Sequence, residues 1–332
     1  MKAWIPEYYR TFQCIASACP DSCCKEWEVD VDETAAAFYR NLPGSLGDSL
    51  RAVLKDTEDG TVMTIQDGRC PMWRQDGLCR IQAELGHNAL CQVCQDFPRL
   101  RHDYGNFVEY GLELSCPEAA RLILTQSHVM IAEEIPGEET PEYDGDTMEI
   151  LLTSRKAILD FLDTTCLPVN QALVVLLLYA HEVQSWIDGG NPAIIDVQSS
   201  IALARKYATT GNWDILLDFF RDLEILTPQW RSRLSTPEKT CQWHKGYLAL
   251  AKYFIERYWL QAVSDYDLIC RAKLIIIACL LIYHLGGAFI ETTQLFSKEI
   301  ENDPDNLEAV LDGAYTSPAL TDIQLLSLLL NS

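Results

Sequence analysis

The segment from Cys14 to Trp27 has the sequence CIASACPDSCCKEW and places four cysteines within eleven residues. Their spacing is C-x4-C-x3-C-C, so one turn of the chain can direct two sulfurs at a single ion. Thiolates bind zinc and iron well, and a closed site needs about four such ligands. This segment therefore predicts a metal site within an irregular fold.

Further cysteines follow in short groups, at Cys70, Cys79, Cys91, Cys94 and Cys116. Nine of the thirteen cysteines thus lie within about 100 residues, beside Asp-Gly turns. Cysteine is often only a small buried hydrophobe, but this density exceeds what burial alone explains. The remaining four fall on apolar helical faces and are predicted to be ordinary buried residues; they are Cys166, Cys241, Cys270 and Cys279.

The overall charge disfavours several classes of function. The chain of 332 residues has 48 acidic and 26 basic residues and a net charge of -22, which argues against binding nucleic acid or docking on anionic lipid. Residues 1–10 lack the apolar stretch of a secretory signal. We therefore expect a cytoplasmic protein without membrane insertion, in which thiols stay reduced and disulfides are disfavoured.

Composition predicts three parts. Residues 133–149 hold eight acidic residues, two prolines and no lysine or arginine, which is typical of a solvated linker. Residues 1–132 contain the dense cysteines and short, irregular elements, whereas residues 150–332 show helical periodicity throughout. The sequence predicts a mainly α protein, with an irregular cysteine-rich N-terminal module containing a few short strands, followed by an all-helical C-terminal domain.

Apolar periodicity and turn residues predict the individual elements. In the N-terminal part, we expect strands at 27–31, 61–65 and 107–114, and helices at 81–85, 89–94 and 116–131. In the C-terminal part, we expect helices at 147–163, 169–188, 192–209, 212–225, 238–262 and 267–290, then two or three shorter ones. The apolar stretch 274–290 is predicted to be a buried helix and not a membrane span.

Several motifs, in order, resemble the flagellin lysine-N-methylase (FliB) family. Residues 8–27 have the pattern YYxxFxCIxSxCxDSCCxxW, and residues 68–72 are GRCPM, with DGLCxIQxELG at 76–86. CxxFPR follows at 94–99, and LSCPEAAR at 114–121. These motifs cover residues 8–121, about a third of the chain. The helical remainder fits the family only in general character.

The resemblance implies transfer of a methyl group from S-adenosylmethionine to lysine ε-amines of flagellin. It also implies an iron–sulfur cluster, [4Fe-4S], with zinc as the alternative metal. Cys91 departs from the family pattern, so the implied metal ligands are the eight matching cysteines: Cys14, Cys19, Cys23, Cys24, Cys70, Cys79, Cys94 and Cys116. One site needs only three or four of them, and the sequence leaves open which ones bind.

A conventional methyltransferase holds its cofactor on a glycine-rich loop that follows a strand. This sequence contains no Gly-x-Gly and no alternating strand–helix pattern. If S-adenosylmethionine binds, it does so without that fold. One hypothesis is that a cluster with an open iron anchors the amino and carboxylate groups of the cofactor.

Methyl transfer also requires a neutral amine, because lysine is protonated below a pKa of about 10.4. No catalytic residue is assigned, but several side chains near the cysteines in sequence are candidate proton acceptors: Tyr8, Tyr9, Asp21, Glu26, Asp96 and Glu118. Arg99 is a candidate partner for a carboxylate. His87 and His102 are further candidate metal ligands.

Two other functions fit the same cysteines. The site could serve only to fold a non-enzymatic metal-binding protein. Alternatively, the pairs Cys23–Cys24 or Cys91–Cys94 could act as a redox sensor.

Overall fold

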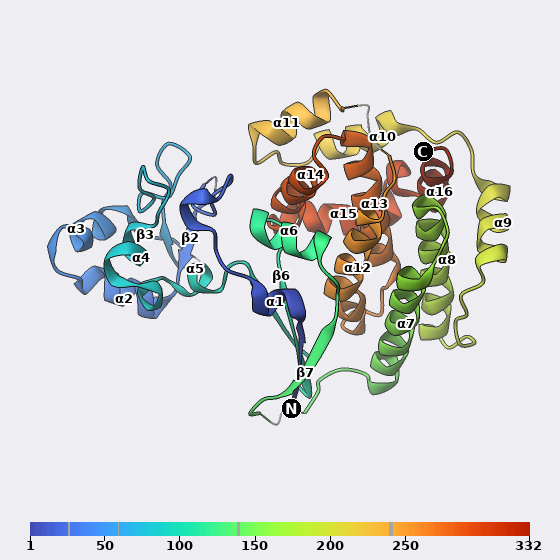
Figure 1. The fold of residues 1–332 in the computed structure, drawn as a ribbon, viewed down its shortest axis with the longest axis horizontal. Coiled ribbons are helices and arrows are strands. Elements are labelled where there is room, and N and C mark those ends of the chain that lie inside the picture. The colour runs from blue at the N-terminus through green and yellow to red at the C-terminus, as the bar shows by residue number, and fades with distance from the viewer. Residues whose placement is uncertain (26, 59, 138–139, 239–241) are drawn as a thin grey trace.

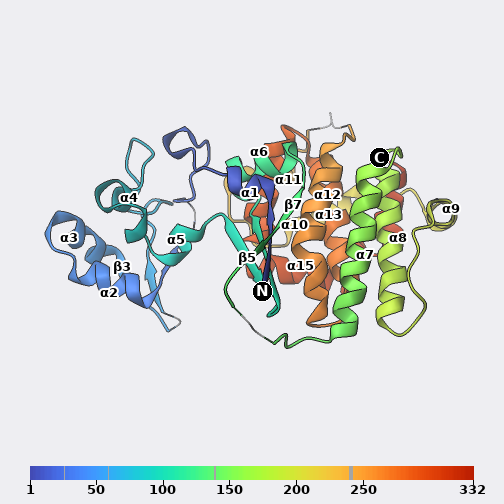
Figure 2. The same ribbon diagram turned by 60° about the horizontal axis from the view of Figure 1, so that its bottom comes forward.

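The structure is a computed structural model that describes residues 1–25, 27–58, 60–137, 140–238 and 242–332. Figure 1 shows a small lobe at one end and a larger helical body at the other, with extended segments between them. Figure 2 shows the same separation after a turn about the horizontal axis. The molecule therefore consists of two regions, a small lobe and a helical body.

The small lobe contains a three-stranded sheet and short helices (Figure 1). Its elements are β2 (Val29–Val31), α2 (Glu33–Asn41), α3 (Gly44–Val53), β3 (Leu54–Asp56), β4 (Thr61–Met63), α4 (Arg80–Leu85) and α5 (Gln92–Asp96). Strand β4 lies between β2 and β3 and is antiparallel to both. Asp32 caps α2 by accepting from the Ala35 amide at 2.9 Å, and its other oxygen accepts from the Gln92 amide at 2.8 Å. One side chain thus joins the starts of α2 and α5.

A second sheet lies beside the helical body, in the order β5-β6-β1-β7. Its strands are β1 (Lys2–Pro6), β5 (Arg99–Asp103), β6 (Phe107–Leu112) and β7 (Met130–Glu134). Strand β1 is parallel to β6 and antiparallel to β7. The N-terminal residues therefore pair with segments more than 100 residues away.

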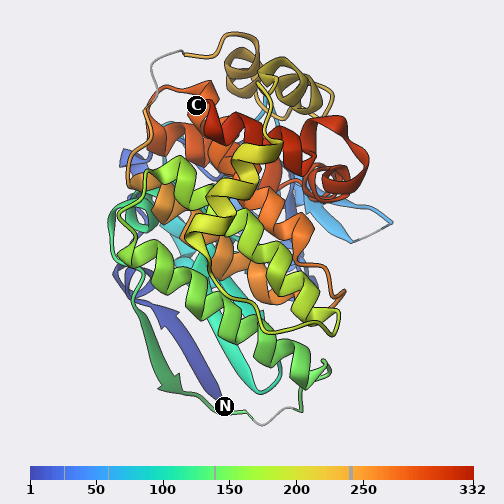
Figure 3. The same ribbon diagram turned by 90° about the vertical axis from the view of Figure 1, so that its right-hand side faces the viewer.

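The helical body consists of the elements that follow this sheet. They are α7 (Gly145–Thr164), α8 (Val169–Ile187), α9 (Val197–Tyr207), α10 (Trp213–Arg221), α11 (Pro228–Ser235), α12 (Gly246–Tyr258), α13 (Ile269–Leu285), α14 (Phe289–Phe296), α15 (Pro304–Thr316) and α16 (Asp322–Leu330). Helix α13 is buried on all faces except at Tyr283 and His284, and it contacts α8, α12 and α15. Figure 3 shows α7 and α8 in front of it, with β1 and β7 along one side of the body.

The four-stranded sheet shares the hydrophobic core of the helical body. Tyr8, Phe107 and Leu112 belong to the same buried cluster as the residues of α8, α12 and α13. Helix α1 (Glu7–Thr11) and helix α6 (Pro117–Thr125) also lie on this side of the molecule. The small lobe has a separate cluster centred on Tyr39 and Leu50.

The prediction of a mainly α protein with a few short strands in its N-terminal region is confirmed. Residues 274–285 of the stretch predicted as a buried helix belong to α13, in the centre of the body, and the helix ends before Gly286. Within the described ranges, no helix is long and apolar enough to cross a membrane.

Several element boundaries differ from prediction. The helix expected over 267–290 is divided at Gly286 and Gly287 into α13 and α14. Residues 239–241 of the helix expected over 238–262 lie outside the described residues, and α12 begins at Gly246. The helix expected to reach residue 131 ends at Thr125, because Met130–Glu134 pairs with β1 as strand β7. Helix α7 begins at Gly145, inside the linker predicted at 133–149. The Asp144 carboxylate caps this helix by accepting from the Thr147 amide at 2.7 Å. The division into 1–132, 133–149 and 150–332 stays a prediction.

Candidate functional site

Six cysteines line one cavity of about 490 Å³ at the base of the small lobe, here called the cysteine cavity. They are Cys23, Cys24, Cys70, Cys79, Cys91 and Cys94. Trp27, Tyr39 and Met72 contribute apolar surface to the same wall. Cysteines from three separate segments of the chain therefore meet in one place.

Backbone hydrogen bonds position these cysteines. The Cys70 amide donates to the Cys24 carbonyl at 2.8 Å, which joins the first two segments. Cys91 stands at the N-terminus of α5, where its carbonyl accepts from the Gln95 amide at 3.0 Å. Cys94 follows one helical turn later, so its sulfur and that of Cys91 lie on the same side.

The thiols perturb one another. Contact with Cys23 and with Cys70 lowers the pKa of Cys24 to about 3, and the same contacts raise the pKa values of those two partners. Contact with Cys94 lowers the pKa of Cys91, while the pKa of Cys94 is raised. One sulfur in each contacting group is thus favoured as the thiolate, which is the form that binds metals.

Three of the eight predicted ligands lie outside this cavity wall. Cys14, Cys19 and Cys116 form a neighbouring group. Burial raises the pKa of Cys116 most, and the nearby thiols of Cys19 and Cys14 raise it further. Cys23 is close enough to interact with Cys14 and Cys116 as well as with Cys24. The structure thus brings together five of the predicted ligands, together with Cys91, and places the other three next to them.

The donor set matches the chemistry of a thiolate-bound metal. In the described part of the chain, no three Cys, His, Asp or Glu side chains converge in metal-ligand geometry. Six soft sulfur donors nevertheless surround one cavity, which is more than a zinc ion or an iron–sulfur cluster requires.

The later cysteines differ from this group. Cys270 and Cys279 are buried in α13, and Cys166 is exposed after α7. Cys241 lies outside the described residues. Burial in α13 agrees with the structural role predicted for Cys270 and Cys279, whereas Cys166 lies at the surface.

A buried π-helical turn, Ser297–Glu301, connects the helical body to the cysteine segments. Lys298 donates to Asp21 at 3.1 Å and lies 5.3 Å from the centre of the Trp27 ring. Glu301 lines the cysteine cavity with its side chain fully buried. This turn brings charged groups of the body to the edge of the cavity.

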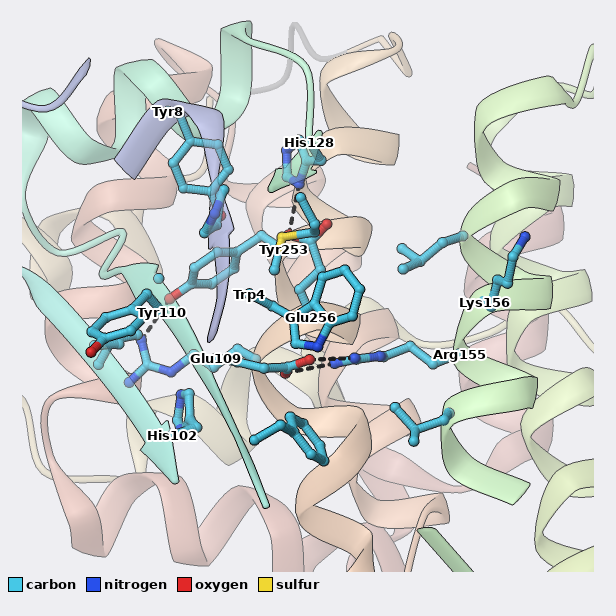
Figure 4. Close-up of a pocket in the computed structure, with 18 of the residues that line it drawn as sticks. Trp4, Tyr8, His102, Glu109, Tyr110, His128, Arg155, Lys156, Tyr253 and Glu256 are labelled. Atoms are coloured by element: carbon cyan, nitrogen blue, oxygen red, sulfur yellow. Dashed lines mark hydrogen bonds and ion pairs between the residues drawn. The ribbon is translucent and has the colours of Figure 1, made fainter. Parts of the chain in front are cut away.

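A second cavity, of about 670 Å³, lies between the four-stranded sheet and helices α7 and α12, and is here called the polar pocket (Figure 4). Arg155 of α7 forms a bidentate ion pair with Glu109 of β6, at 2.8 and 2.5 Å. His128 Nδ1 lies 2.8 Å from the Glu256 carboxylate of α12. Both pairs are largely buried, so the pocket is lined by charged groups that already have partners.

The wall between the two cavities is a buried polar network. Arg257 and Tyr253 line the polar pocket, whereas Glu301 lines the cysteine cavity. The Arg257 Nη1 donates to the Tyr253 hydroxyl at 2.6 Å, and that hydroxyl donates to Glu301 at 3.1 Å. Tyr258 also donates to Glu301, at 2.9 Å. Groups facing one cavity are thus hydrogen-bonded to a group facing the other.

An acidic groove of about 1110 Å³ adjoins the cysteine cavity. Seven acidic residues line it: Asp30, Asp32, Glu33, Asp56, Glu58, Asp96 and Glu113. The basic residues along it are Arg40 and Arg99. Asp30 and Glu113 also line the cysteine cavity, so the groove and the cavity are neighbours at these residues.

Two of the three candidate catalytic residues lie together. The Arg99 guanidinium lies 6.0 Å from the centre of the Tyr9 ring and 5.1 Å from that of Phe12, and it faces the acidic groove. Tyr9 is half-buried, with its ring centre 5.5 Å from that of Tyr110. Tyr8 is buried against His128 in the polar pocket, and burial raises its pKa well above the ordinary value. The structure thus brings Tyr9 and Arg99 together and places Tyr8 in a different cavity.

The other candidates are also dispersed. Asp96 lines the acidic groove, whereas Glu118 pairs with Arg121 on the first turn of α6. Asp21 is bound by Lys298, and Glu26 lies outside the described residues. His102 lines the polar pocket, not the cysteine cavity.

The sequence did not indicate the charged residues of the polar pocket and its wall. Glu109 and Arg155 are 46 positions apart, and no motif joins them. Charged residues within apolar helical stretches, such as Arg257 and Glu301, could have indicated this network. A buried charge requires a partner, so such residues are expected to meet other polar groups.

No protein-family model and no solved structure matches the chain, but curated proteins do match part of its sequence. A protein named Lysine-N-methylase from Salmonella typhimurium (strain LT2) is 34% identical over 139 residues, which is 39% of this chain and 34% of the relative. The Lysine-N-methylase of Salmonella choleraesuis gives the same values. The chain thus spans about a third of the length of the curated lysine-N-methylases it matches.

A shorter relative is matched over most of its length. The Flagellar biosynthetic protein FliU of Salmonella muenchen is 33% identical over 132 residues, which is 38% of this chain and 78% of the relative. Fold and site define a mainly helical protein with a cysteine-lined cavity beside a small lobe. By these relatives, the chain belongs to the lysine-N-methylase family, which confirms the resemblance found in its motifs.

Proposed function

We propose that this protein transfers a methyl group from S-adenosylmethionine to lysine ε-amines of flagellin, in the cytoplasm, with a metal centre held in the cysteine cavity. The observation that carries the proposal is the meeting of six cysteines around one cavity. Membership of the lysine-N-methylase family supplies the reaction class, and the name of the FliU relative supports a flagellar substrate.

The metal centre proposed is a [4Fe-4S] cluster, with zinc as the alternative. Its ligands would come from the cavity wall: Cys23, Cys24, Cys70, Cys79 and Cys94 from the family motifs, and Cys91 beside them. When bound, either metal supplies a Lewis acid that can hold and polarise a polar group of a substrate. Six cysteines are more than a site with four ligands needs. Some of them would therefore contact the ligating cysteines without binding the metal themselves.

The transfer has a simple balance of bonds. A bond forms between the lysine nitrogen and the methyl carbon, and the bond from that carbon to the sulfonium sulfur breaks. The sulfur keeps the electron pair and leaves as a thioether, while the nitrogen gives up one proton to a base. The amine must be neutral to attack, so the site has to accept a proton from a lysine of pKa about 10.4.

The acidic groove suits a cationic substrate. Seven acidic residues against two basic ones attract an approaching ammonium group and raise its local concentration. Because Asp30 and Glu113 line both the groove and the cysteine cavity, a lysine side chain held at these residues would lie next to the proposed metal centre.

The contacts between thiols also favour a second candidate. Cys91 and Cys94 perturb each other's pKa, as do Cys23 and Cys24, and such pairs suit a redox sensor. In a sensor, these cysteine pairs would be oxidised and reduced reversibly, and no methyl group would be transferred.

The test is methylation of purified flagellin by the full-length protein, prepared without air and supplied with S-adenosylmethionine. Mass spectrometry should show methyl additions on flagellin lysines. Cys24→Ser should lower the rate by about 100-fold or more, because it removes a sulfur at the centre of the thiol group. Cys166→Ser is the matched control, since Cys166 is exposed and remote from the cavity, and it should leave the rate unchanged.

Absence of methyl transfer from the wild-type protein would contradict the proposal. Zinc at one equivalent in a protein without transfer would favour the non-enzymatic metal-binding function. Circular dichroism should show that Cys24→Ser retains its helices, because most of them belong to the body.

A further inference from the structure

Four cysteines are not needed by a metal centre in the cysteine cavity. Five of the six cysteines in the cavity wall remain when Cys23 is set aside, and a closed centre needs about four. Cys14, Cys19 and Cys116 lie beside the cavity, outside its wall. These four cysteines are therefore available for a separate role.

The backbones that carry three of them lie side by side. The residues that directly follow Cys14, Cys19 and Cys116 all line one cavity of about 800 Å³, and they are Ile15, Pro20 and Pro117. Helices α6, α11 and α14 contribute the rest of that lining. The loop that carries Cys14 and Cys19 therefore borders the start of α6, which comes much later in the chain.

A shared hydrogen-bond donor holds these two segments together. Gln294 of α14 donates to the Asp21 carboxylate at 3.0 Å and to the Ser115 carbonyl at 2.8 Å. Asp21 belongs to the loop of residues 19–23, and Ser115 directly precedes Cys116. Helix α14 itself packs against α6 (Figure 1). The contact between the loop and the start of α6 is thus fixed from the helical body.

The four sulfurs are neighbours as well. Cys19 interacts electrostatically with Cys14, and Cys116 interacts with both. Cys23 interacts with Cys14 and Cys116. Like the cavity cysteines, the four thiols do not converge on one point among the described residues. The structure nevertheless supplies four soft donors in one neighbourhood, from two distant segments of the chain.

We propose that Cys14, Cys19, Cys23 and Cys116 bind a second metal ion, zinc, outside the cysteine cavity. Four thiolates complete the tetrahedral shell of a structural zinc site. Cys14 and Cys23 are exposed, and zinc suits an exposed site because it does not change its oxidation state. The inference depends on the positions of the cysteines and not on the transfer of a methyl group.

Such a zinc ion would join the two regions of the molecule. Cys116 stands at the N-cap of α6, whose buried residues belong to the core of the helical body. The loop of residues 14–23 instead leads into the small lobe, which begins at β2. The zinc would therefore hold the lobe, and with it the cysteine cavity, in position against the wall that contains Glu301.

The test is the metal content of the full-length protein, purified without air, dialysed and measured by plasma mass spectrometry. The wild type should contain about one zinc per chain in addition to the metal of the cysteine cavity. Cys116→Ser should lower that zinc by about fivefold or more and keep the cavity metal. Serine is a good N-cap residue, so α6 should be retained.

Cys79→Ser is the matched variant in the cavity wall, since Cys79 and Cys116 are both half-buried. It should lose the cavity metal and keep the zinc of the second site. If both sites hold zinc, each variant should lose one ion, and the double variant should lose both. Cys166→Ser should retain all the metal.

Metal for only one centre in the wild type would overturn the inference. So would loss of all the metal in both Cys116→Ser and Cys79→Ser, or full retention of zinc by a Cys116→Ser protein whose circular dichroism matches the wild type. Cys19→Ser is a second variant of the site, in which serine can keep the hydrogen bond to the Asp21 carbonyl, and it should lose the same zinc. Two metal centres in a wild type that methylates no flagellin would support the second site and reject the proposed function.

Discussion

The small lobe and the helical body differ sharply in how much they bury. Among the described residues, the hydrophobic cluster of the lobe contains 14 side chains, and that of the body with its sheet contains 63. The lobe consists of strands of three residues and short helices, whereas α7 and α8 each extend over about twenty residues. Units with so little core commonly depend on a metal or a disulfide to stay folded.

This difference assigns separate roles to the two regions. The lobe and its loops supply the cysteines, so the metal centre and the stability of the lobe should depend on each other. The body supplies the polar pocket within a core that needs no metal.

The largest effect should follow loss of the metal centre. Cys24→Ser, or removal of metal by a chelator, should lower the free energy of opening of the lobe by about 3 kcal/mol or more, because metal binding is coupled to folding. Hydrogen exchange followed by mass spectrometry should show faster exchange in α2 and α3 and unchanged exchange in α13. Equal acceleration in both regions would contradict the comparison.

The next effect concerns the apolar cores. Leu280→Ala in α13 and Leu50→Ala in α3 each remove a fully buried side chain, at a cost of about 2 to 5 kcal/mol. Hydrogen exchange should show that Leu280→Ala destabilises the body, whereas Leu50→Ala destabilises only the lobe. If Leu50→Ala lowered the stability of the body by the same amount, the chain would be a single cooperative unit.

The smallest effect is a pH dependence confined to the body. Burial raises the pKa of Glu299 from 4.5 to about 6. Between these values the folded protein retains a proton that the unfolded chain has released, so stability should fall as the pH rises through this window. The loss should be about 1 to 2 kcal/mol.

Thermal unfolding at about pH 4.5 and pH 6.5 can measure this loss, with Glu299→Gln as the comparison. Glutamine cannot ionise, so the variant should lack this part of the pH dependence. An identical pH dependence in both proteins would show that Glu299 does not titrate in this window.

The sequence predicted the site better where the chemistry is local. Cysteines spaced by a few residues indicate shared ligands, and five of the eight predicted ones line a single cavity. Cys91 lies in the same wall although it departs from the family pattern, because it stands one helical turn before Cys94. The spacing of residues along the sequence therefore predicts contacts between side chains one helical turn apart.

Long-range pairing was not predictable in the same way. Strand β1 was missed because its partners begin at Phe107 and Met130, and nothing in Lys2–Pro6 specifies them. The polar pocket was missed for the same reason, since Glu109 and Arg155 meet only after the sheet packs on α7. Periodicity predicts which face of a helix is buried but not which charged groups will meet there.

The metal and acid-labile sulfide content of the full-length protein, purified without air, tests whether the cysteine cavity holds an iron–sulfur cluster. We expect about four irons and four sulfides per chain, with visible absorption that Cys24→Ser removes and Cys166→Ser retains. A protein that contains no bound metal, or whose metal content is the same in Cys24→Ser, would contradict it.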